Sequence, residues 1–408
     1  MFSSRNEETP GPAISLMFDK RLRVAGEVLE GEVHINFPSL MKDKVEEVHI
    51  KLRGSIYTYI ARKRGDHRNN RHNETQRIQL IHDTISLWQQ GNDVYPPPDS
   101  HILRLPFRFT LPPNLPPSCE FNGYQKSGTI GYFVQVVGKR DMLHLDKRVL
   151  IAFPVVQRDS EGAQLREAFL AGWQGPWKTL GGQRDIRRGI WGEYSNAKIS
   201  LVMPDVEALP ILTPIPIILN IVTLSKLGKQ DDWPSDKPIF PAPPSTPELL
   251  DFRIQRRVHL SAYQISATSA DHFVSYVGGL GPGLSEVAYK NVQIEVPDKV
   301  WIPSLDRDEK TQRGQWKQQV TFKSFIRFTS PPSFGAMTMG VTYSLRLTVD
   351  FPGIGNGLQF DFPVVLKSCL GPLPEGQQAV AWDGPPPELD LPPAYFEATG
   401  WHHNEEKE

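Results

Sequence analysis

At 408 residues, the chain is longer than one ordinary domain, so two or three domains are expected. Hydrophobic residues make up 39% and charged residues 22%, a composition that supports a packed core and excludes wholesale disorder. The net charge of −1 excludes a global attraction to nucleic acid or membranes, so any basic function must be local.

Three sequence features favour a cytoplasmic protein. The first residues, MFSSRNEETPGP, contain neither the basic nor the apolar region of a secretion signal. Cys119 and Cys369 lie far apart without ligand spacing, so neither a disulfide framework nor a zinc site is expected. The most apolar run, ILTPIPIILNIVTL at 211–224, is too short to span a bilayer and contains prolines, which favours a buried strand.

Alternating apolar and polar residues predict strands in the first part of the chain. Successive side chains of a strand point to opposite faces, so each run offers one face to a core. The runs are EVHINF at 32–37, EVHIKLRG at 47–54 and TIGYFVQVVGKR at 129–140. Their apolar members are Val33, Ile35 and Phe37, then Val48, Ile50 and Leu52, then Ile130, Tyr132, Val134 and Val136.

One stretch breaks this alternation. In EGAQLREAFLAGW, at 161–173, Leu165, Phe169 and Trp173 are four residues apart and share one face of a helix. Packing over an apolar sheet surface is the favoured interpretation, and a membrane or partner helix is the alternative. The surrounding Gly- and Arg-rich segment, 158–195, is predicted to link two β-rich halves.

The second half repeats the strand pattern. Its apolar alternation comprises Val258, Leu260 and Ala262, then Val320 and Phe322, then Val341, Tyr343, Leu345, Leu347 and Val349. Many short strands with proline and glycine between them favour an all-β fold of sandwich type over α/β. From residue 371 the sequence has no strand or helix period, and its prolines predict an extended, disordered tail.

In their order, these segments resemble the arrestin superfamily, specifically a fungal arrestin-related (α-arrestin) trafficking adaptor. The resemblance covers residues 13–370 and a motif in the tail. It rests on GEVLEGEVHINF at 26–37, LPFRFTLPPNLPPSCEF at 105–121, GTIGYFVQVVGKR at 128–140, RRGIWGEYSNAKISLVMPDV at 187–206 and FDFPVVLKS at 360–368. Many relatives carry two or more PPxY motifs on long tails, whereas this chain has one on a short tail.

The resemblance implies two tandem antiparallel β-sandwiches with a short linker helix. The N-terminal sandwich would span 13–157, the linker 158–195, the C-terminal sandwich 196–370 and the Pro-rich tail 371–408. It implies a non-enzymatic adaptor that joins an integral-membrane cargo, a transporter or receptor, to a WW-containing HECT-type ubiquitin ligase. Ubiquitylation and endocytic sorting would follow, with recruitment from the cytoplasm to the plasma membrane or endosomes.

Two other functions stay open. An arrestin-like scaffold or sorting-coat subunit would bind protein partners without recruiting a ligase. A β-sandwich enzyme or sugar-binding module is disfavoured, because the sequence lacks GxSxG, HExxH and Cys–His constellations. No cofactor, metal or catalytic residue is expected.

The tail motif is Pro392, Pro393, Ala394 and Tyr395, which fits the PPxY pattern of WW-domain ligands. The proline pair pre-sets an extended helix and loses little entropy on docking into an aromatic groove. Tyr395 lies two residues after the proline pair, where its ring and hydroxyl can occupy a second pocket of a WW domain. The alternative is a chance match in a proline-rich chain.

A basic stretch, ARKRGDHRNNRHNETQR at 61–77, follows a predicted strand. Arginine makes bidentate contacts with phosphates and carboxylates, so the stretch could bind acidic or phosphorylated cargo tails, or anionic lipid headgroups. The alternative is a solvated hairpin loop, and nucleic acid is not expected because the patch is one loop of a neutral protein. The candidate residues are Arg62, Lys63, Arg64, Arg68, Arg71 and Arg77.

Overall fold

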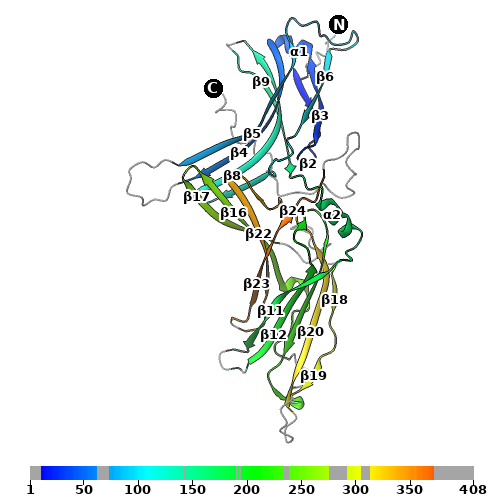
Figure 1. The fold of residues 1–408 in the computed structure, drawn as a ribbon, viewed down its shortest axis with the longest axis vertical. Helices are drawn as coiled ribbons and strands as arrows, with labels where there is room; N and C mark the ends of the chain where they lie inside the picture. Colours follow the sequence, from blue (N-terminus) through cyan, green and yellow to red (C-terminus); the bar gives the residue numbers. More distant parts are fainter. Residues whose placement is uncertain are drawn as a thin grey trace, which may run out of the picture.

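The protein consists of two β-sandwiches placed end to end, with a short helix at one side of their junction (Figure 1). The structure is a computed structural model. It describes residues 11–61, 73–141, 144–189, 192, 194–233, 239–274, 292–304, 313–353 and 355–371.

The N-terminal sandwich is built from two antiparallel sheets. One sheet has the order β1–β3–β6, and the other β5–β4–β8–β7 with β9 on β8. A short parallel pair joins β2 (Arg23–Val24) to β10 (Val155–Val156). The remaining elements are β1 (Ile14–Met17), β3 (Val28–Asn36), α1 (Phe37–Lys42), β4 (Val45–Ile60), β5 (Glu74–Gln89), β6 (Ile102–Thr110), β7 (Cys119–Gly123), β8 (Lys126–Arg140) and β9 (Lys147–Phe153).

The C-terminal sandwich repeats this plan. One sheet has the order β11–β12–β14–β20–β15, with β18 and β19 also on β20, and the other β17–β16–β22–β21, with β23 on β22. A parallel pair again joins β13 (Leu209–Pro210) to β24 (Leu366–Lys367). The remaining elements are α2 (Gly162–Leu170), β11 (Trp177–Arg187), β12 (Tyr194–Pro204), β14 (Ile215–Leu224), β15 (Gly228–Lys229), β16 (Leu250–Ala262), β17 (Ile265–Val274), β18 (Gln293–Glu295), β19 (Val300–Pro303), β20 (Arg313–Ile326), β21 (Phe334–Gly335), β22 (Met339–Val349), β23 (Leu358–Val364) and the 3-10 turns Gln230–Asp232 and Pro247–Leu249.

The predicted all-β class with tandem sandwiches is confirmed. Apart from Phe37, the apolar residues of the predicted strands are buried, because alternation gives each strand one core-facing side. In β14, burial alternates residue by residue, so the most apolar run of the chain is a strand, as expected. Both short pairs that join distant segments are parallel, an exception to the antiparallel rule of the sheets.

Phe37 departs from the predicted strand at 32–37. It begins α1, because the Asn36 side chain accepts a hydrogen bond from the backbone N–H of Ser39 at 3.3 Å and caps the helix. Pro38 in the first turn lacks the N–H that a strand would need and suits a helix start. The strand therefore ends one residue earlier than the alternation suggests.

The predicted linker at 158–195 contains a helix and also a strand. Leu165 and Phe169 lie on α2 and pack against the core, which bears out the packing interpretation of this helix. Trp173 lies beyond the helix, and its ring stacks on Phe169 with centroids 4.8 Å apart. β11, however, pairs with β12 along its whole length, from Trp177↔Pro204 to Arg187↔Tyr194. The segment that connects the sandwiches therefore ends before Trp177, whereas the Gly-rich composition of β11 had favoured a linker up to residue 195.

The two sandwiches pack directly against each other. The Thr58 hydroxyl on β4 donates to the Thr338 hydroxyl at 3.0 Å, and the backbone N–H of Tyr263 donates to the Gln76 side chain at 2.8 Å. A Cβ at Gly128 would lie 2.5 Å from Leu260 of the opposite sandwich, so glycine permits this close approach. Buried apolar residues of both units form one continuous cluster.

Candidate functional site

Both sites predicted from the sequence lie outside the described residues. Pro392, Pro393 and Tyr395 belong to 372–408, and Arg62, Lys63, Arg64, Arg68 and Arg71 belong to 62–72. Arg77 is described and lies exposed on β5. The structure does describe the residues that flank these two segments.

The basic segment joins β4 to β5, which pair antiparallel up to Ile60↔Glu74. The stem is held on both sides. Ala61 N–H donates to the Gln125 carbonyl at 2.8 Å, and Gln76 contacts Tyr263 of the C-terminal sandwich. The strands that carry the basic segment therefore form a hairpin stem at the contact between the two sandwiches (Figure 1).

The tail begins at the junction of the sandwiches. After β24, the Ser368 hydroxyl donates to the Gln157 carbonyl at 2.6 Å, and Asp159 N–H donates to the Leu370 carbonyl at 2.8 Å. Gln157 and Asp159 belong to the segment that leads from β10 to α2. The start of the connection and the last described residues of the chain therefore run side by side, and this meeting place is called the junction below.

Asp159 organises the junction. Its carboxylate accepts a hydrogen bond from the backbone N–H of Gly162 at 3.0 Å, at the first residue of α2. Burial, followed by the charge and hydrogen bond of Asp159, raises the pKa of the Cys369 thiol to about 12. The thiol is therefore protonated at neutral pH and does not act as a nucleophile. Cys119 is also buried, and the two cysteines, both described, are not joined by a disulfide.

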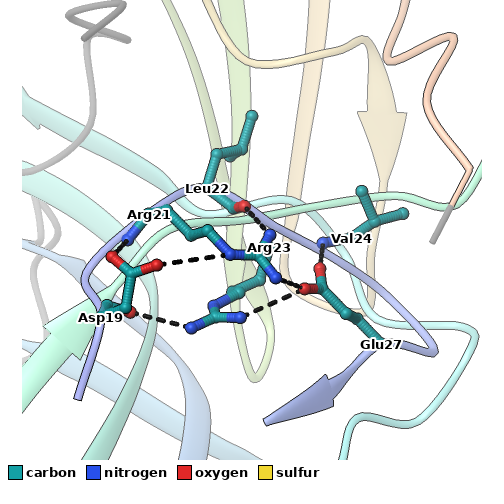
Figure 2. Close-up of polar contacts among 6 residues, drawn as sticks. All are labelled: Asp19, Arg21, Leu22, Arg23, Val24 and Glu27. Atoms are coloured by element: carbon teal, nitrogen blue, oxygen red, sulfur yellow. Dashed lines mark hydrogen bonds and ion pairs between the residues drawn. The ribbon is translucent and has the colours of Figure 1, made fainter. Parts of the chain in front are cut away.

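An ionic cluster built on the buried Arg23–Glu27 pair lies beside β2 and orders the turn into β3 (Figure 2). The Arg23 guanidinium contacts a Glu27 carboxylate oxygen at 3.1 Å, and Arg21 reaches the same oxygen. The other Glu27 oxygen accepts from the backbone N–H of Val24 at 3.0 Å. Gly26 in this turn has φ +89°, which a side chain would strain.

The cluster is balanced in charge. Asp19 contacts Arg21 at 3.4 Å, so two guanidinium groups face two carboxylates. Burial lowers the pKa of Arg23, repulsion from Arg21 lowers it further, and Glu27 acts in the opposite direction. Because the charges cancel, the cluster offers no excess field for an anion. Its role is to fix β2 against β10, where Arg23 N–H donates to the Pro154 carbonyl at 2.9 Å.

Neither the junction nor this cluster was predicted from the sequence. The run DKRLRVAGE at 19–27 was a usable signal for the cluster, because it places five ionisable groups within nine residues, and any that are buried need partners. The junction had no such signal, since it joins residues more than 200 positions apart.

Among the described residues, no group of three or more His, Cys, Asp or Glu is placed so that it could hold a metal ion. In the same part of the chain, no helix is long and apolar enough to cross a membrane.

Residues 14–158 match the family model described as "Arrestin (or S-antigen), N-terminal domain". The match begins at β1 and ends just after β10, so it covers the N-terminal sandwich and stops at the junction. No curated protein matches the chain.

Proposed function

The chain belongs to the arrestin superfamily, and on that premise we propose that it is a non-enzymatic trafficking adaptor of the fungal arrestin-related (α-arrestin) kind. The match over residues 14–158 is the observation that carries this proposal. The family is one of adaptors and scaffolds, which bind protein partners. The specific partners proposed below rest on the tail motif and the basic segment.

The tail would recruit a HECT-type ubiquitin ligase through its WW domains. Pro392, Pro393 and Tyr395 fit the WW ligand pattern, and the tail begins at the junction, on a surface that both sandwiches share. A ligase held there would stand close to cargo bound on either sandwich. A single short motif gives an affinity of about 10–100 μM, so useful engagement needs several adaptors clustered with cargo.

The sandwiches would bind the cytoplasmic face of an integral-membrane transporter or receptor. The two sandwiches would act together because they share a packed interface. The N-terminal sandwich is proposed at 13–157. The C-terminal sandwich is proposed at 196–370, together with β11, which pairs with β12. The basic segment would bind acidic cargo tails or anionic lipid headgroups, because it sits on a hairpin stem beside that interface. The protein would work in the cytoplasm, on the plasma membrane or endosomes.

The ligase role is tested by calorimetry of the full chain against a panel of WW domains. Tyr395→Ala should abolish binding and leave the melting temperature unchanged, whereas Ala394→Ser should bind like the wild type. Cargo binding that persists without any WW interaction would leave the alternative, a scaffold or sorting-coat subunit that recruits no ligase.

The basic segment is tested by charge reversal. Arg62→Glu, Lys63→Glu and Arg64→Glu together should weaken binding to anionic liposomes and acidic peptides and flatten its salt dependence, because screened ion contacts are lost. The matched control is a triple reversal at the exposed cations Arg104, Arg184 and Lys198. Equal binding by both triple variants would support the alternative interpretation, in which the segment is a solvated hairpin loop.

A further inference from the structure

The connection from β5 to β6 carries an exposed aromatic–proline run, Val94-Tyr95-Pro96-Pro97-Pro98-Asp99, called the YPPP segment below. Neither helix nor strand is assigned to it. It belongs to the N-terminal sandwich, about 300 residues before the tail motif in the sequence. Its chemistry is independent of that motif.

Covalent geometry sets the backbone of this segment. Each proline ring locks φ near −65°. Tyr95, Pro96 and Pro97 each precede a proline, and a residue before proline is pushed out of the helical region into the extended one. Pro96 and Pro97 carry both restrictions and favour the polyproline II conformation, which has three residues per turn, up to the turn at Pro98 and Asp99.

The YPPP segment is anchored to the sandwich at its first residue and closed by a turn at its end. The Trp88 indole N–H donates to the Val94 carbonyl at 3.2 Å, and the Phe37 ring packs edge-on against Trp88 with centroids 5.6 Å apart. At the other end, Ser100 N–H donates to the Pro97 carbonyl at 3.0 Å. A segment held this way has already lost most of the conformational freedom that binding would cost.

The rings of the segment face outward. Tyr95 is 64% exposed, although its ring centroid is only 6.2 Å from that of Phe37. Val94 is 41% exposed, and Pro97 and Pro98 are exposed as well. The exposed part of these apolar groups is not covered by the core, so that surface is available to a partner.

The order of the residues selects the kind of partner. A WW ligand of the PPxY type places tyrosine after the prolines, whereas here Tyr95 comes before them. An SH3 ligand carries a cation beside its prolines, and residues 91–103 contain neither lysine nor arginine. We propose that the YPPP segment is a ligand for an EVH1-type proline-recognition groove, which seats an aromatic ring ahead of a proline run. Asp99 favours a basic rim on that groove.

The test is calorimetry of the full-length chain carrying Tyr395→Ala, which removes the tail motif, against purified EVH1, WW and SH3 domains. Binding to an EVH1 domain is expected at about 10–100 μM. Tyr95→Ala should weaken it at least about tenfold, because the anchoring ring is lost. Tyr95→Phe should bind normally, and Tyr124→Ala, at another exposed turn tyrosine, is the matched control.

Because Tyr95 contacts Phe37, thermal unfolding of each variant accompanies the titrations. If Tyr95→Ala lowers the melting temperature, Pro98→Ala is the variant to compare with the wild type. Pro98 is exposed, and its loss removes the restriction that holds Pro97 in the extended conformation. The proposal is overturned by the absence of EVH1 binding, by binding to WW or SH3 domains alone, or by equal affinity of the wild type and Pro98→Ala.

Discussion

The two sandwiches build the same local structure with different chemistry. In each, a two-residue parallel pair ties an early strand to a late one, β2 to β10 in the N-terminal unit and β13 to β24 in the C-terminal unit. Beside β2, the turn is held by the buried charges of Arg23 and Glu27. Beside β13, it is held by neutral hydrogen bonds, among them that of the buried Thr213 hydroxyl to the Ile211 carbonyl at 3.0 Å.

The difference extends through both units. The N-terminal sandwich also buries His49 and Arg53, whereas Arg256 is the one buried Asp, Glu, His, Lys or Arg among the described residues of the C-terminal sandwich. A buried charge requires its partner, since an unpaired charge in a low-dielectric interior is costly. We therefore expect the N-terminal sandwich to be more sensitive to loss of charge and to pH.

The largest effect is expected from breaking the ionic cluster. Glu27→Gln keeps the shape of the side chain but leaves the Arg23 guanidinium, which is 5% exposed, without its carboxylate. Loss of one partner from a buried pair costs about 3–5 kcal/mol of unfolding free energy. Chemical denaturation measures the loss. Glu30→Gln, at an exposed ion pair with Arg108, is the control and should change the stability by less than about 1 kcal/mol. Equal losses would mean that the cluster is not a stabilising feature.

The second effect tests the buried charge of the C-terminal sandwich. Arg256 makes a two-pronged contact with Asp271, with nitrogen–oxygen distances of 3.1 and 2.6 Å. Asp271→Asn removes the charge from these hydrogen bonds and should cost about 1.5–3 kcal/mol, because bonds to charged groups contribute about that much. Denaturation curves would show it. A loss larger than that of Glu27→Gln would reverse the ranking of the two units.

The third prediction sharpens the comparison through pH. Burial lowers the pKa of His49 below its ordinary 6.5, and nearby Lys51 and Lys139 lower it further. Between the folded and unfolded pKa values, the unfolded chain binds the extra proton, so stability is full above about pH 6.5 and falls as the pH drops. The slope from this one group is at most about 1.4 kcal/mol per pH unit.

His49→Gln should flatten that part of the stability–pH curve, measured by denaturation from pH 7.5 down to 5. The exposed His259, on β16, provides the matched control. Equal flattening by His259→Gln would contradict the assignment of the effect to His49. An unchanged slope in the His49 variant would show that this imidazole does not titrate across the window.

The smallest effect is expected at the neutral turn. Thr213→Val removes one hydroxyl, together with its hydrogen bond to the Ile211 carbonyl, and keeps the branched shape. The net cost of one neutral hydrogen bond is about 0.5–1.5 kcal/mol. Thermal unfolding would detect it. A cost as large as that of Glu27→Gln would mean that both parallel pairs depend equally on their polar contacts.

The sequence alone determined the class of the fold and several of its long strands. Alternation in β4, β8, β16 and β22 predicted which residues are buried. One face of each strand packs against the core and the other does not, whichever strand it pairs with. It also placed a helix near 161–173, since four-residue spacing is local information. The sequence did not predict β11, whose Gly181 and Gly182 weaken the strand signal. Nor did it predict that Phe37 starts a helix, because the Asn36 cap outweighs one step of alternation.

Tertiary structure decided how distant segments meet. The contact of Ser368 with Gln157 spans 211 positions, and that of Thr58 with Thr338 spans 280, so no local pattern encodes either. The tail motif and the basic segment were readable as short chemical patterns. Their attachment points, the junction and the β4–β5 hairpin stem, exist only after the sheets pair and the sandwiches pack. The physical reason is that strand periodicity specifies which face is buried, while the partner of that face is chosen by long-range pairing.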